Sequence, residues 1–357
     1  MSMDRIQELR KKIDGIDDKL LDLLNERARI VIEIGNIKKT GKIDFHSPSR
    51  EREIIERLTV RNHGPLPQDT LKAVFREIMS SSLSLERPLK IAYLGPRATF
   101  THMAGMQQFG LAAQYVPVEN IKDVFSEVER GRADYGVVPI ENTTSGAVNY
   151  TLDMFIDSDL KIAAEILLEV SQHLMNKSGK IGDIKKVYTI SPAAAQCRQW
   201  LEKNLPGVPV LDATSTAAAA EMAVDDPFAG AIASEMAAVL YGLQIAGKKI
   251  EDNASNITRF LVIAPKSPGK TGRDKTSIMF SIKDKVGALY SMLAPFAESG
   301  INLNRLDARP SGRKVWDYVF FLDMEGHIED EKVARAIESL RKDSMFLKVL
   351  GSYPRSQ

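Results

Sequence analysis

The sequence predicts a multidomain protein with three folds in series: an all-helical segment, an α/β segment and an α+β segment. Residues 1–87 carry only helical periodicity. Residues 88–265 alternate short apolar runs, each ended by Gly, Pro, Asn or Ser, with helical stretches. Residues 275–354 follow the order strand, helix, strand, strand, helix, strand. A chain of 357 residues suits two or three domains at roughly 100–200 residues each.

The composition argues against several kinds of partner and cofactor. Lys plus Arg is 48 and Asp plus Glu is 47, a balance that disfavours a nucleic-acid surface. The N-terminus is charged and no run approaches the roughly 18 apolar residues of a membrane span, so we expect neither a leader peptide nor a membrane partner. The one cysteine, Cys197, allows no internal disulfide and predicts a cytoplasmic location. Because the histidines lack ligand spacing and no Gly-rich phosphate loop is present, we expect no metal and no cofactor.

The helical segment begins with a long apolar seam. Its a and d positions are Ile6, Leu9, Ile13, Ile16, Leu20, Leu23, Ile30, Ile34 and Ile37. Gly41 ends this helix, Ser47 and Pro48 cap and open a second, and a third follows the run Gly-Pro-Leu-Pro at 64–67. The first helix is roughly 50 Å long, too long to bury its seam alone. The pattern therefore predicts a homodimer or higher homo-oligomer.

Cations lie on or beside the seam. Arg27 falls on an a position, where a guanidinium needs an anion: a nearby or partner carboxylate, or a ligand. Arg10 and Lys38 fall on flanking e positions, which usually hold solvated interhelical pairs. Arg10 and Arg27 are roughly 25 Å apart along one helix. In an antiparallel dimer, however, Arg10 of one helix can face Arg27 of the other, and two guanidinium groups suit a small dicarboxylate.

The run LRKKIDGIDDKLLDLLNERARIVIEIGNIK, then SPSRE, then FREIMSSSLSLE resembles the all-helical type of chorismate mutase. The resemblance implies a domain over residues 1–88 that rearranges chorismate to prephenate. It implies an active site that spans a dimer interface and is lined by Arg10 of the partner subunit, Arg27, Lys38, Arg50, Glu51, Ser82 and Glu86.

The residue types suit this rearrangement, which needs no nucleophile and no general base. The enzyme must hold the two ends of the substrate together and stabilise negative charge on the ether oxygen. Arginines would bind the carboxylates, Lys38 would face the ether oxygen, and Glu51 would accept from the ring hydroxyl. Glu86 stands where some members carry Gln. Since a carboxylate cannot donate a hydrogen bond, we expect Glu86 to act protonated and mutase activity to fall as the pH rises.

The α/β segment is expected to form a mainly parallel sheet with polar residues at strand ends. Its apolar runs are KIAYLGP, DYGVVPIEN, KKVYTIS and FAGAIAS. After the first, Gly95 and Pro96 make a turn and Thr99 or Thr101 could cap the next helix and bind a carboxylate. The second offers Glu141 to Thr144 at a carboxyl end, where α/β sheets bind ligands. Each of these could instead be an ordinary helix cap or Asx turn.

Four runs in this segment occur together in the order of prephenate dehydratase and resemble that family over residues 90–263: YLGPxxTF, VPIEN(S/T)xxG, AQCRxWL and IEDNxxNxTRF. The resemblance implies a domain over residues 89–266 with two α/β lobes and a cleft, like a periplasmic binding protein. It implies that Thr258 helps to protonate the leaving hydroxyl. Residues implied to line the cleft are Thr99, Glu141, Asn142, Thr143, Arg259 and Phe260.

This reaction would release carbon dioxide and hydroxide from prephenate to give phenylpyruvate. The gain of aromaticity drives it, so an acid near the hydroxyl and poor solvation of the carboxylate are sufficient. The chain departs from the family pattern at Ala98, where Gly is common, and before Cys197, where a His-Pro-Gln pattern is usual.

After the linker PKSPGKTGRDK, the last segment predicts a ferredoxin-like α+β unit. Its runs VGALYSML and INLNRLDARP resemble the ACT regulatory domain, over residues 275–354. The resemblance implies that L-phenylalanine binds between paired domains, at Gly287, Ala288, Leu289, Asn302, Asp307, Arg309 and Pro310. Gly287 would let the ligand approach the main chain closely. From the residues alone, a plain packed module is the alternative.

Together these segments predict a cytoplasmic, bifunctional enzyme of phenylalanine biosynthesis, with chorismate and prephenate as substrates and feedback inhibition by L-phenylalanine. Two alternatives remain. The dehydratase could prefer arogenate, the amino analogue of prephenate, or the two-lobed domain could be a non-catalytic sensor of a small acid. Formation of phenylpyruvate from prephenate separates the sensor from the enzyme.

Overall fold

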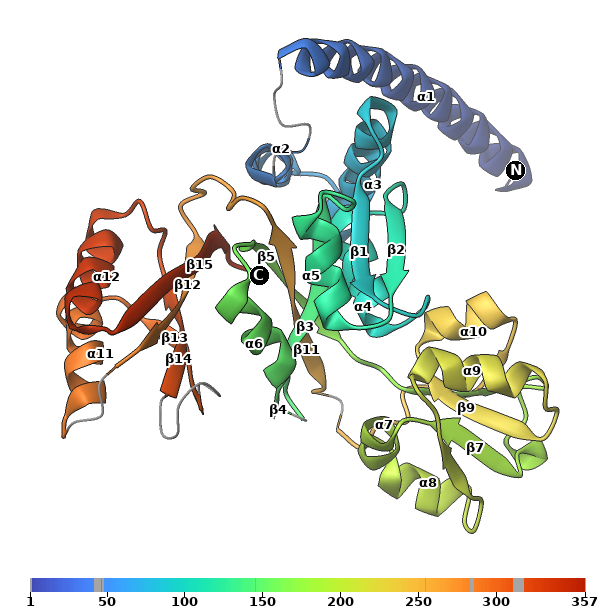
Figure 1. Cartoon of the computed structure of the whole chain (residues 1–357). Helices are drawn as coiled ribbons and strands as arrows, with labels where there is room; N and C mark the ends of the chain where they lie inside the picture. The colour runs from blue at the N-terminus through green and yellow to red at the C-terminus, as the bar shows by residue number, and fades with distance from the viewer. Residues whose placement is uncertain are drawn as a thin grey trace. The chain divides into compact units, whose positions relative to one another are not determined.

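The computed structural model describes residues 2–41, 46, 48–144, 146–253, 255–282, 286–310 and 318–356 (Figure 1). The chain forms two compact units. The first comprises Met1–Leu89 with Phe109–Gln114, and the second Lys90–Gln108 with Tyr115–Gln357.

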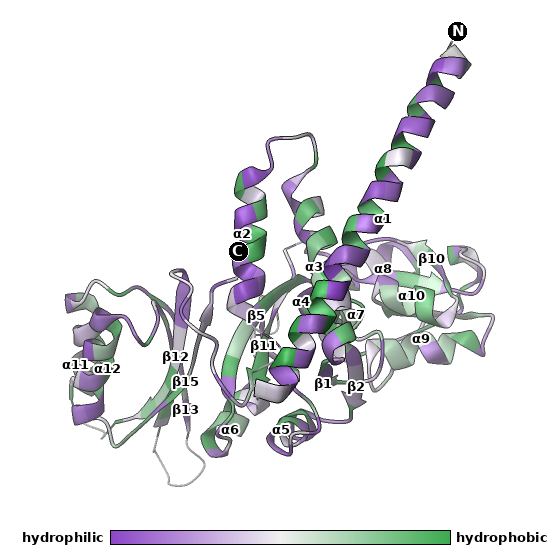
Figure 2. Ribbon diagram, turned by 90° about the horizontal axis from the view of Figure 1, so that it is seen from above, coloured by the Kyte–Doolittle hydropathy of each residue, from purple (hydrophilic) through white to green (hydrophobic). Residues whose placement is uncertain are grey.

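The first unit is helical, as the sequence predicts. Its helices are α1 (Ser2–Gly41), α2 (Pro48–Arg61) and α3 (Gln68–Glu86). Helix α1 ends at Gly41, while the predicted cap at Ser47 lies outside the described residues. The apolar seam recurs along α1 in Figure 2, and from Ile6 to Leu23 each seam residue is between 45% and 61% exposed. The helices of one chain therefore leave this part of the seam uncovered.

The second unit starts with a six-stranded sheet in the order β2-β1-β3-β11-β5, with β4 paired to β3. Its strands are β1 (Lys90–Leu94), β2 (Gln114–Val118), β3 (Tyr135–Asn142), β4 (Gly146–Ala147), β5 (Lys161–Glu169) and β11 (Ile257–Ala264). Its helices are α4 (Phe100–Phe109), α5 (Ile121–Glu129) and α6 (Asn149–Asp157). Phe125 of α5 and Phe155 of α6 are fully buried and meet edge to face.

A second lobe carries the five-stranded sheet β10-β6-β9-β7-β8. Its strands are β6 (His173–Asn176), β7 (Lys186–Thr189), β8 (Val210–Asp212), β9 (Ala229–Ala233) and β10 (Gln244–Gly247). A 3-10 turn, η1 (Ile181–Asp183), and four helices accompany them: α7 (Ser191–Gln196), α8 (Arg198–Asn204), α9 (Thr216–Val224) and α10 (Glu235–Tyr241). Alanines of α9, β9 and α10 are fully buried, so the helices pack closely on this sheet.

Both sheets are mixed, whereas the apolar runs suggested a mainly parallel arrangement. In the first sheet β1 and β3 are parallel, but β11 is antiparallel to both β3 and β5. The chain leaves the first lobe after β5 and returns to it through β11. Two neighbouring strands that carry the chain out and back must run in opposite directions.

The C-terminal part is the predicted α+β fold. Its elements in order are β12 (Asp274–Ser281), α11 (Ala288–Glu298), β13 (Leu303–Pro310), β14 (Tyr318–Glu325), α12 (Glu331–Asp343) and β15 (Phe346–Pro354). The strands form an antiparallel sheet in the order β13-β14-β12-β15. One face, with Phe280 and Leu322, packs on α11 and α12. The other, with Met279 and Phe321, shares a core with residues of the first lobe.

Strand β15 approaches strand β5 at Gly351. A Cβ atom at this position would lie 2.9 Å from the Ile162 main-chain nitrogen and closer still to its carbonyl oxygen. Because the obstacle is main chain and not a flexible side chain, the contact admits only glycine. The C-terminal sheet therefore rests directly on the backbone of the first lobe.

We predict that Gly351→Ala lowers the free energy of unfolding of the second unit by about 1–3 kcal/mol, because β15 and β5 must move apart. Urea unfolding followed by tryptophan fluorescence measures it, since Trp200 lies in this unit. Gly269→Ala is the matched control, because a Cβ there would meet nothing within 4 Å. Equal unfolding free energies for the two variants would contradict the close approach.

Candidate active sites

The helical unit contains a cavity of about 800 Å³ lined by all three helices. Its lining residues are Leu23, Glu26, Arg27, Ile30, Val31, Ile34, Lys38, His46, Arg50, Glu51, Ile54, Arg57, Phe75, Met79, Ser82, Leu83 and Glu86. Six of the seven residues implied for a mutase site are in this set. The seventh, Arg10, lies on the exposed N-terminal half of α1 and does not line the cavity of its own chain.

Two cations of α1 are held by side chains of α3. The Arg27 guanidinium donates to the Ser82 hydroxyl, which donates in turn to the Ile78 carbonyl oxygen at 2.6 Å. Burial lowers the pKa of Arg27, because a charged guanidinium is costly away from water. Lys38 Nζ lies 3.0 Å from Glu86 Oε2, and the Glu86 side chain is only 6% exposed. The Lys38 ammonium and the Glu86 carboxyl group therefore lie side by side in the wall of the cavity.

Gly35 makes room for Glu86. A Cβ atom at position 35 would lie 2.9 Å from Glu86 Cγ, so a larger residue would push the Glu86 side chain from its present place. The glycine thereby brings the carboxylate to the wall of the cavity.

Three polar lining residues were missed by the sequence analysis as members of the site: Glu26, His46 and Arg57. His46 is nearly buried, with Nε2 3.2 Å from Glu51 Oε1. Arg57 follows Arg50 by seven residues and therefore shares its face of α2, a spacing that could have revealed it. No spacing could have revealed His46, which precedes α2.

The cavity suits a small anion with an apolar ring. Its cations are Arg27, Lys38, Arg50 and Arg57, against the carboxylates Glu26, Glu51 and Glu86. Apolar side chains of the three helices make up much of the remaining wall. Positive charge beside an apolar wall can bind carboxylates and stabilise negative charge that develops on a bound ether oxygen.

A second group of polar residues meets at one edge of the first sheet. The carboxyl ends of β1 and β3 and the start of antiparallel β11 share this edge. Asn142 Nδ2 donates to Thr258 Oγ1 at 2.8 Å. Thr143 Oγ1 lies 3.0 Å from both the Ser255 carbonyl oxygen and the Ile257 nitrogen. The structure thus brings three predicted dehydratase residues together.

The sequence analysis missed a row of amides that continues from Thr258 into the second lobe. Asn142 Nδ2 also donates to Asn256 Oδ1 at 2.7 Å. Gln196 Oε1, on α7, accepts from Asn256 Nδ2 at 3.0 Å and from Gln172 Nε2 at 3.2 Å. Asn256 and Gln196 belong to the runs IEDNxxNxTRF and AQCRxWL, which contained the signal.

Thr99 lies in the turn after β1. Its Oγ1 donates to the carbonyl oxygens of Leu94 and Pro96 at 3.2 and 3.1 Å. Ala98 has a φ of 63°, in the left-handed region that costs a side chain roughly 1 kcal/mol, which explains why glycine suits this position. The Ala98 carbonyl oxygen accepts from Ser234 of the second lobe at 2.8 Å. The two lobes therefore touch at this turn.

His102 supports the same turn from beneath. Its Nδ1 accepts from the Ala98 nitrogen at 3.2 Å, and its ring stacks on Tyr93 with centroids 4.6 Å apart. Burial, with a smaller effect from Arg97, lowers the pKa of His102 to about 4. The imidazole is therefore neutral at physiological pH and serves as an acceptor, not as a cation.

The remaining dehydratase residues lie elsewhere. Glu141 and Arg259 face the opposite side of the sheet from Asn142 and Thr258, because side chains alternate along a strand. Arg259 is 7% exposed and is bound by carboxylates of both sheets. Phe260 is 2% exposed. The structure does not bring Glu141 or Arg259 together with Thr258.

The residues implied for effector binding lie at two ends of one strand. Gly287, with a φ of 76°, precedes α11, which begins with Ala288 and Leu289. The segment Asp307–Pro310 ends β13, whereas Asn302 precedes its start, roughly 25 Å away along the strand. One chain therefore does not bring Asn302 and Pro310 into one pocket.

Polar contacts hold three of these side chains. Asn302 Nδ2 donates to Glu325 Oε1 at 3.3 Å. Arg305 Nε donates to Asp307 Oδ2 at 2.6 Å, and Arg309 Nη2 lies 4.0 Å from Asp153 Oδ1.

Taken together, the cavity, the sheet edge and the C-terminal module define a class of enzyme. A cation-lined helical cavity, a separate two-lobed α/β unit with hydroxyl and amide groups at a sheet edge, and an α+β module describe a multidomain enzyme of small carboxylic acids. The sequence matches the chorismate mutase type II family over residues 9–87, the prephenate dehydratase family over 91–268 and the ACT domain over 276–342.

The similarity to two bifunctional proteins covers nearly the whole chain. The bifunctional chorismate mutase/prephenate dehydratase of Aquifex aeolicus is 53% identical over 99% of this chain and 99% of that protein. The bifunctional protein of Escherichia coli K12 is 31% identical over 97% and 95%. A crystal structure of prephenate dehydratase from Arthrobacter aurescens in complex with L-Phe has a TM-score of 0.70 and 36% identity, covering 75% of this chain and 90% of that one.

The chain therefore belongs to the bifunctional chorismate mutase/prephenate dehydratases. It is an isomerase and a lyase of phenylalanine biosynthesis, with an ACT domain behind the two enzymes. Within the described residues, no helix combines the length and the apolar character needed to cross a membrane.

Proposed function

We propose that the helical cavity is the chorismate mutase site and that it works by positioning and charge alone. The observation that carries this proposal is the set of cations Arg27, Lys38 and Arg50 around an apolar cavity large enough for a small cyclic acid. Arg27 and Arg50 bind substrate carboxylates, and Lys38 faces the ether oxygen, where negative charge grows in the transition state. Glu51 accepts from the ring hydroxyl, and Ser82 orients Arg27.

A second copy of the chain completes this site. The seam from Ile6 to Leu23 is exposed, and an antiparallel α1 of the partner subunit would cover it. That arrangement brings Arg10 of the partner subunit to the cavity, whereas the roughly 25 Å from Arg10 to Arg27 along one helix prevents a chain from supplying both. The active enzyme is then a homodimer or a higher assembly of such dimers.

The shared site predicts complementation between two inactive variants. Arg10→Ala and Arg27→Ala should each lower mutase kcat/KM at least tenfold, because each removes a carboxylate ligand. Refolded together, half of the dimers should be mixed, with one intact site of two, which restores about a quarter of wild-type activity. Mutase assays on the mixture measure this. Activity no higher than that of the separate variants would exclude a site built from both subunits.

The proposed role of Glu86 as a hydrogen-bond donor leads to a prediction of how mutase kcat depends on pH. Only the protonated carboxyl can donate to the ether oxygen, so wild-type kcat should fall as the pH rises. Glu86→Gln supplies an amide donor at every pH, and its kcat should vary less between pH 5 and 9 than that of the wild type. Glu26→Gln is the matched control, since Glu26 also lines the cavity and is assigned no donor role. The idea fails if the Glu86→Gln profile retains the wild-type slope.

For the dehydratase, we propose that Thr258 donates a hydrogen bond to the leaving hydroxyl of prephenate. Thr258 Oγ1 accepts from Asn142, so its own hydrogen can be donated toward the substrate. Thr99 and Thr143 lie at the same sheet edge, where α/β sheets bind their ligands. Prephenate is proposed as the substrate, and phenylpyruvate as the product.

Removal of this hydroxyl should disable one activity only. Thr258→Ala is expected to lower dehydratase kcat by about 10²–10⁴ and to leave mutase kcat unchanged, because the mutase site belongs to the other unit. Thr258→Ser keeps the hydroxyl and should retain most of the activity. Phenylpyruvate formation from prephenate is the measurement, with arogenate as a competing substrate. Full activity of Thr258→Ala would refute the assignment.

We further propose that L-phenylalanine inhibits the dehydratase by binding between the C-terminal domains of two chains. Gly287, Ala288 and Leu289 of one chain would meet Asn302 of the other, because helix α11, roughly 16 Å long, separates them within a single chain. Asp307, Arg309 and Pro310 would complete the pocket. Inhibition follows if the ligand binds the less active arrangement more tightly.

Two further assignments accompany this proposal. Domain bounds of 1–88, 89–266 and 275–354 are supported by the end of α3 at Glu86, the end of β11 at Ala264 and the start of β12 at Asp274. A cytoplasmic location is supported by Cys197, which is buried and unpaired. Burial raises the pKa of this thiol to about 12, so it is unreactive.

A further inference from the structure

The strand that carries Thr258 has two functional faces. Thr258 and Asn142 pair across β11 and β3 on one face, and Arg259 and Glu141 pair on the other. A bulge follows directly, between Arg259 and Phe260. Whatever fixes Arg259 therefore also fixes the main chain of β11 one residue from the proposed donor.

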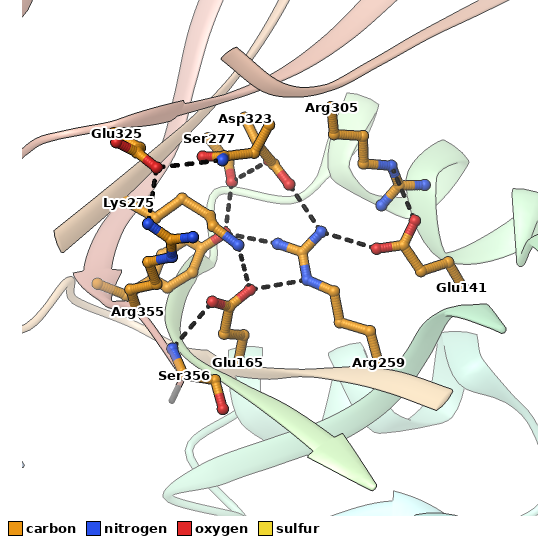
Figure 3. Close-up of polar contacts among 12 residues, drawn as sticks. Glu141, Glu165, Arg259, Lys275, Ser277, Arg305, Asp323, Glu325, Arg355 and Ser356 are labelled. Atoms are coloured by element: carbon orange, nitrogen blue, oxygen red, sulfur yellow. Dashed lines mark hydrogen bonds and ion pairs between the residues drawn. The ribbon is translucent and has the colours of Figure 1, made fainter. Parts of the chain in front are cut away.

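Arg259 is bound at three nitrogen atoms. Its Nη1 donates to Asp323 Oδ2 at 2.7 Å and to Glu141 Oε1 at 3.0 Å. Its Nη2 donates to the Tyr353 hydroxyl at 3.0 Å. Its Nε lies 2.8 Å from Glu165 Oε2. Two of these partners, Asp323 on β14 and Tyr353 on β15, belong to the C-terminal domain, and Figure 3 shows the guanidinium between its carboxylate partners.

Further contacts hold these partners in place. Ser277 Oγ donates to Asp323 and lies 2.7 Å from the Tyr353 hydroxyl. Lys275 Nζ donates to Glu165 Oε2 at 2.6 Å, and Arg305 Nε lies 3.4 Å from Glu141 Oε2. Three cations, Arg259, Lys275 and Arg305, thus lie among the three carboxylates Glu141, Glu165 and Asp323 (Figure 3). Arg305 is also bound by Asp307.

Because this cluster is buried, its charged side chains must stay in contact with one another. Arg259 and Asp323 are each 7% exposed, and Tyr353 is fully buried. Burial by itself would raise the pKa of Asp323, but Arg259 and the hydrogen bond from Ser277 outweigh it, so the pKa is lowered. Asp323 is therefore charged, and a charged group without water must keep its partner.

We propose that Asp323 and Tyr353 of the C-terminal domain are positioning residues for the dehydratase reaction. They bind Arg259 on the face of the sheet opposite Thr258, and they thereby fix the main chain of β11 where Thr258 meets the leaving hydroxyl. The proposal rests on the proposed role of Thr258. Neither residue touches the substrate, and both act through Arg259. The C-terminal domain is then part of the machinery that aligns the dehydratase site.

The test compares four dehydratase variants of the full chain. Asp323→Asn keeps the shape of the side chain but removes the charge, and Tyr353→Phe removes only the hydroxyl. We expect Asp323→Asn to lower dehydratase kcat about tenfold and Tyr353→Phe to lower it severalfold, with smaller changes in KM for prephenate and unchanged mutase kcat. Asp343→Asn and Tyr318→Phe, both on exposed positions of the same domain, are matched controls and should leave dehydratase kcat unchanged.

A second step separates positioning from general stability. In a Thr258→Ala background the Asp323→Asn penalty should largely disappear, because the group that it positions is gone. The same penalty with and without Thr258 would overturn the proposal, as would unchanged kcat in both folded variants. If tryptophan fluorescence shows that Asp323→Asn does not fold, Tyr353→Phe decides alone. Full activity of Thr258→Ala itself would show that the assignment of Thr258 is wrong, and the positioning proposal with it.

Discussion

The Arg259 guanidinium is the point at which the first lobe and the C-terminal domain of the larger unit meet. A guanidinium away from water persists only among anions, and here the anions come from three strands, through Glu141, Glu165 and Asp323. Apolar contacts around it tolerate small shifts, but a slip of one residue in any of these strands would turn a carboxylate away and leave a buried charge unpaired. The register of the first sheet and the docking of the C-terminal sheet are therefore set at one place.

In the helical unit, too, a guanidinium away from water needs an anion, but here the nearest group is not an anion. Within the part of the chain that the structure describes, Arg27 donates to a hydroxyl, that of Ser82, and burial lowers its pKa. Arg50, Arg57 and Lys38 line the same cavity, with one carboxylate fewer than the cations in its wall. In the larger unit the protein supplies every counter-charge and the cluster is structural. In the cavity the lining cations outnumber the lining carboxylates by one, a balance that suits an anionic ligand.

The periodicity of the sequence predicted the helical seam and the faces of the strands. It could not predict contacts between residues far apart in the sequence, or the direction in which a strand runs. The seam, the unusual place of Arg27 and the flanking Lys38 follow from a heptad pattern, and the resemblance to chorismate mutase added Glu86; the cavity includes all three charged residues. Strand periodicity already implied that Thr258 and Arg259 face opposite sides, but the family motif grouped them in one cleft. No local pattern could have paired Arg259 with Asp323, which follows 64 residues later in another domain. Nor does an apolar run reveal its direction, so the antiparallel path of β11 was not foreseen.

The two faces of β11 impose different conditions on one hydroxyl. On the face that carries Thr258, Asn142 donates to Thr258 Oγ1 and also to Asn256 Oδ1. This bond occupies one side of the hydroxyl oxygen and so limits the direction in which the hydroxyl hydrogen points. On the back, the carboxylates around Arg259 fix where the main chain lies. A threonine is a weak acid, so the role proposed for Thr258 rests on alignment more than on proton affinity, and alignment needs both conditions. The buried polar cluster on the far side of the sheet therefore suits a proposed donor that is itself a weak acid.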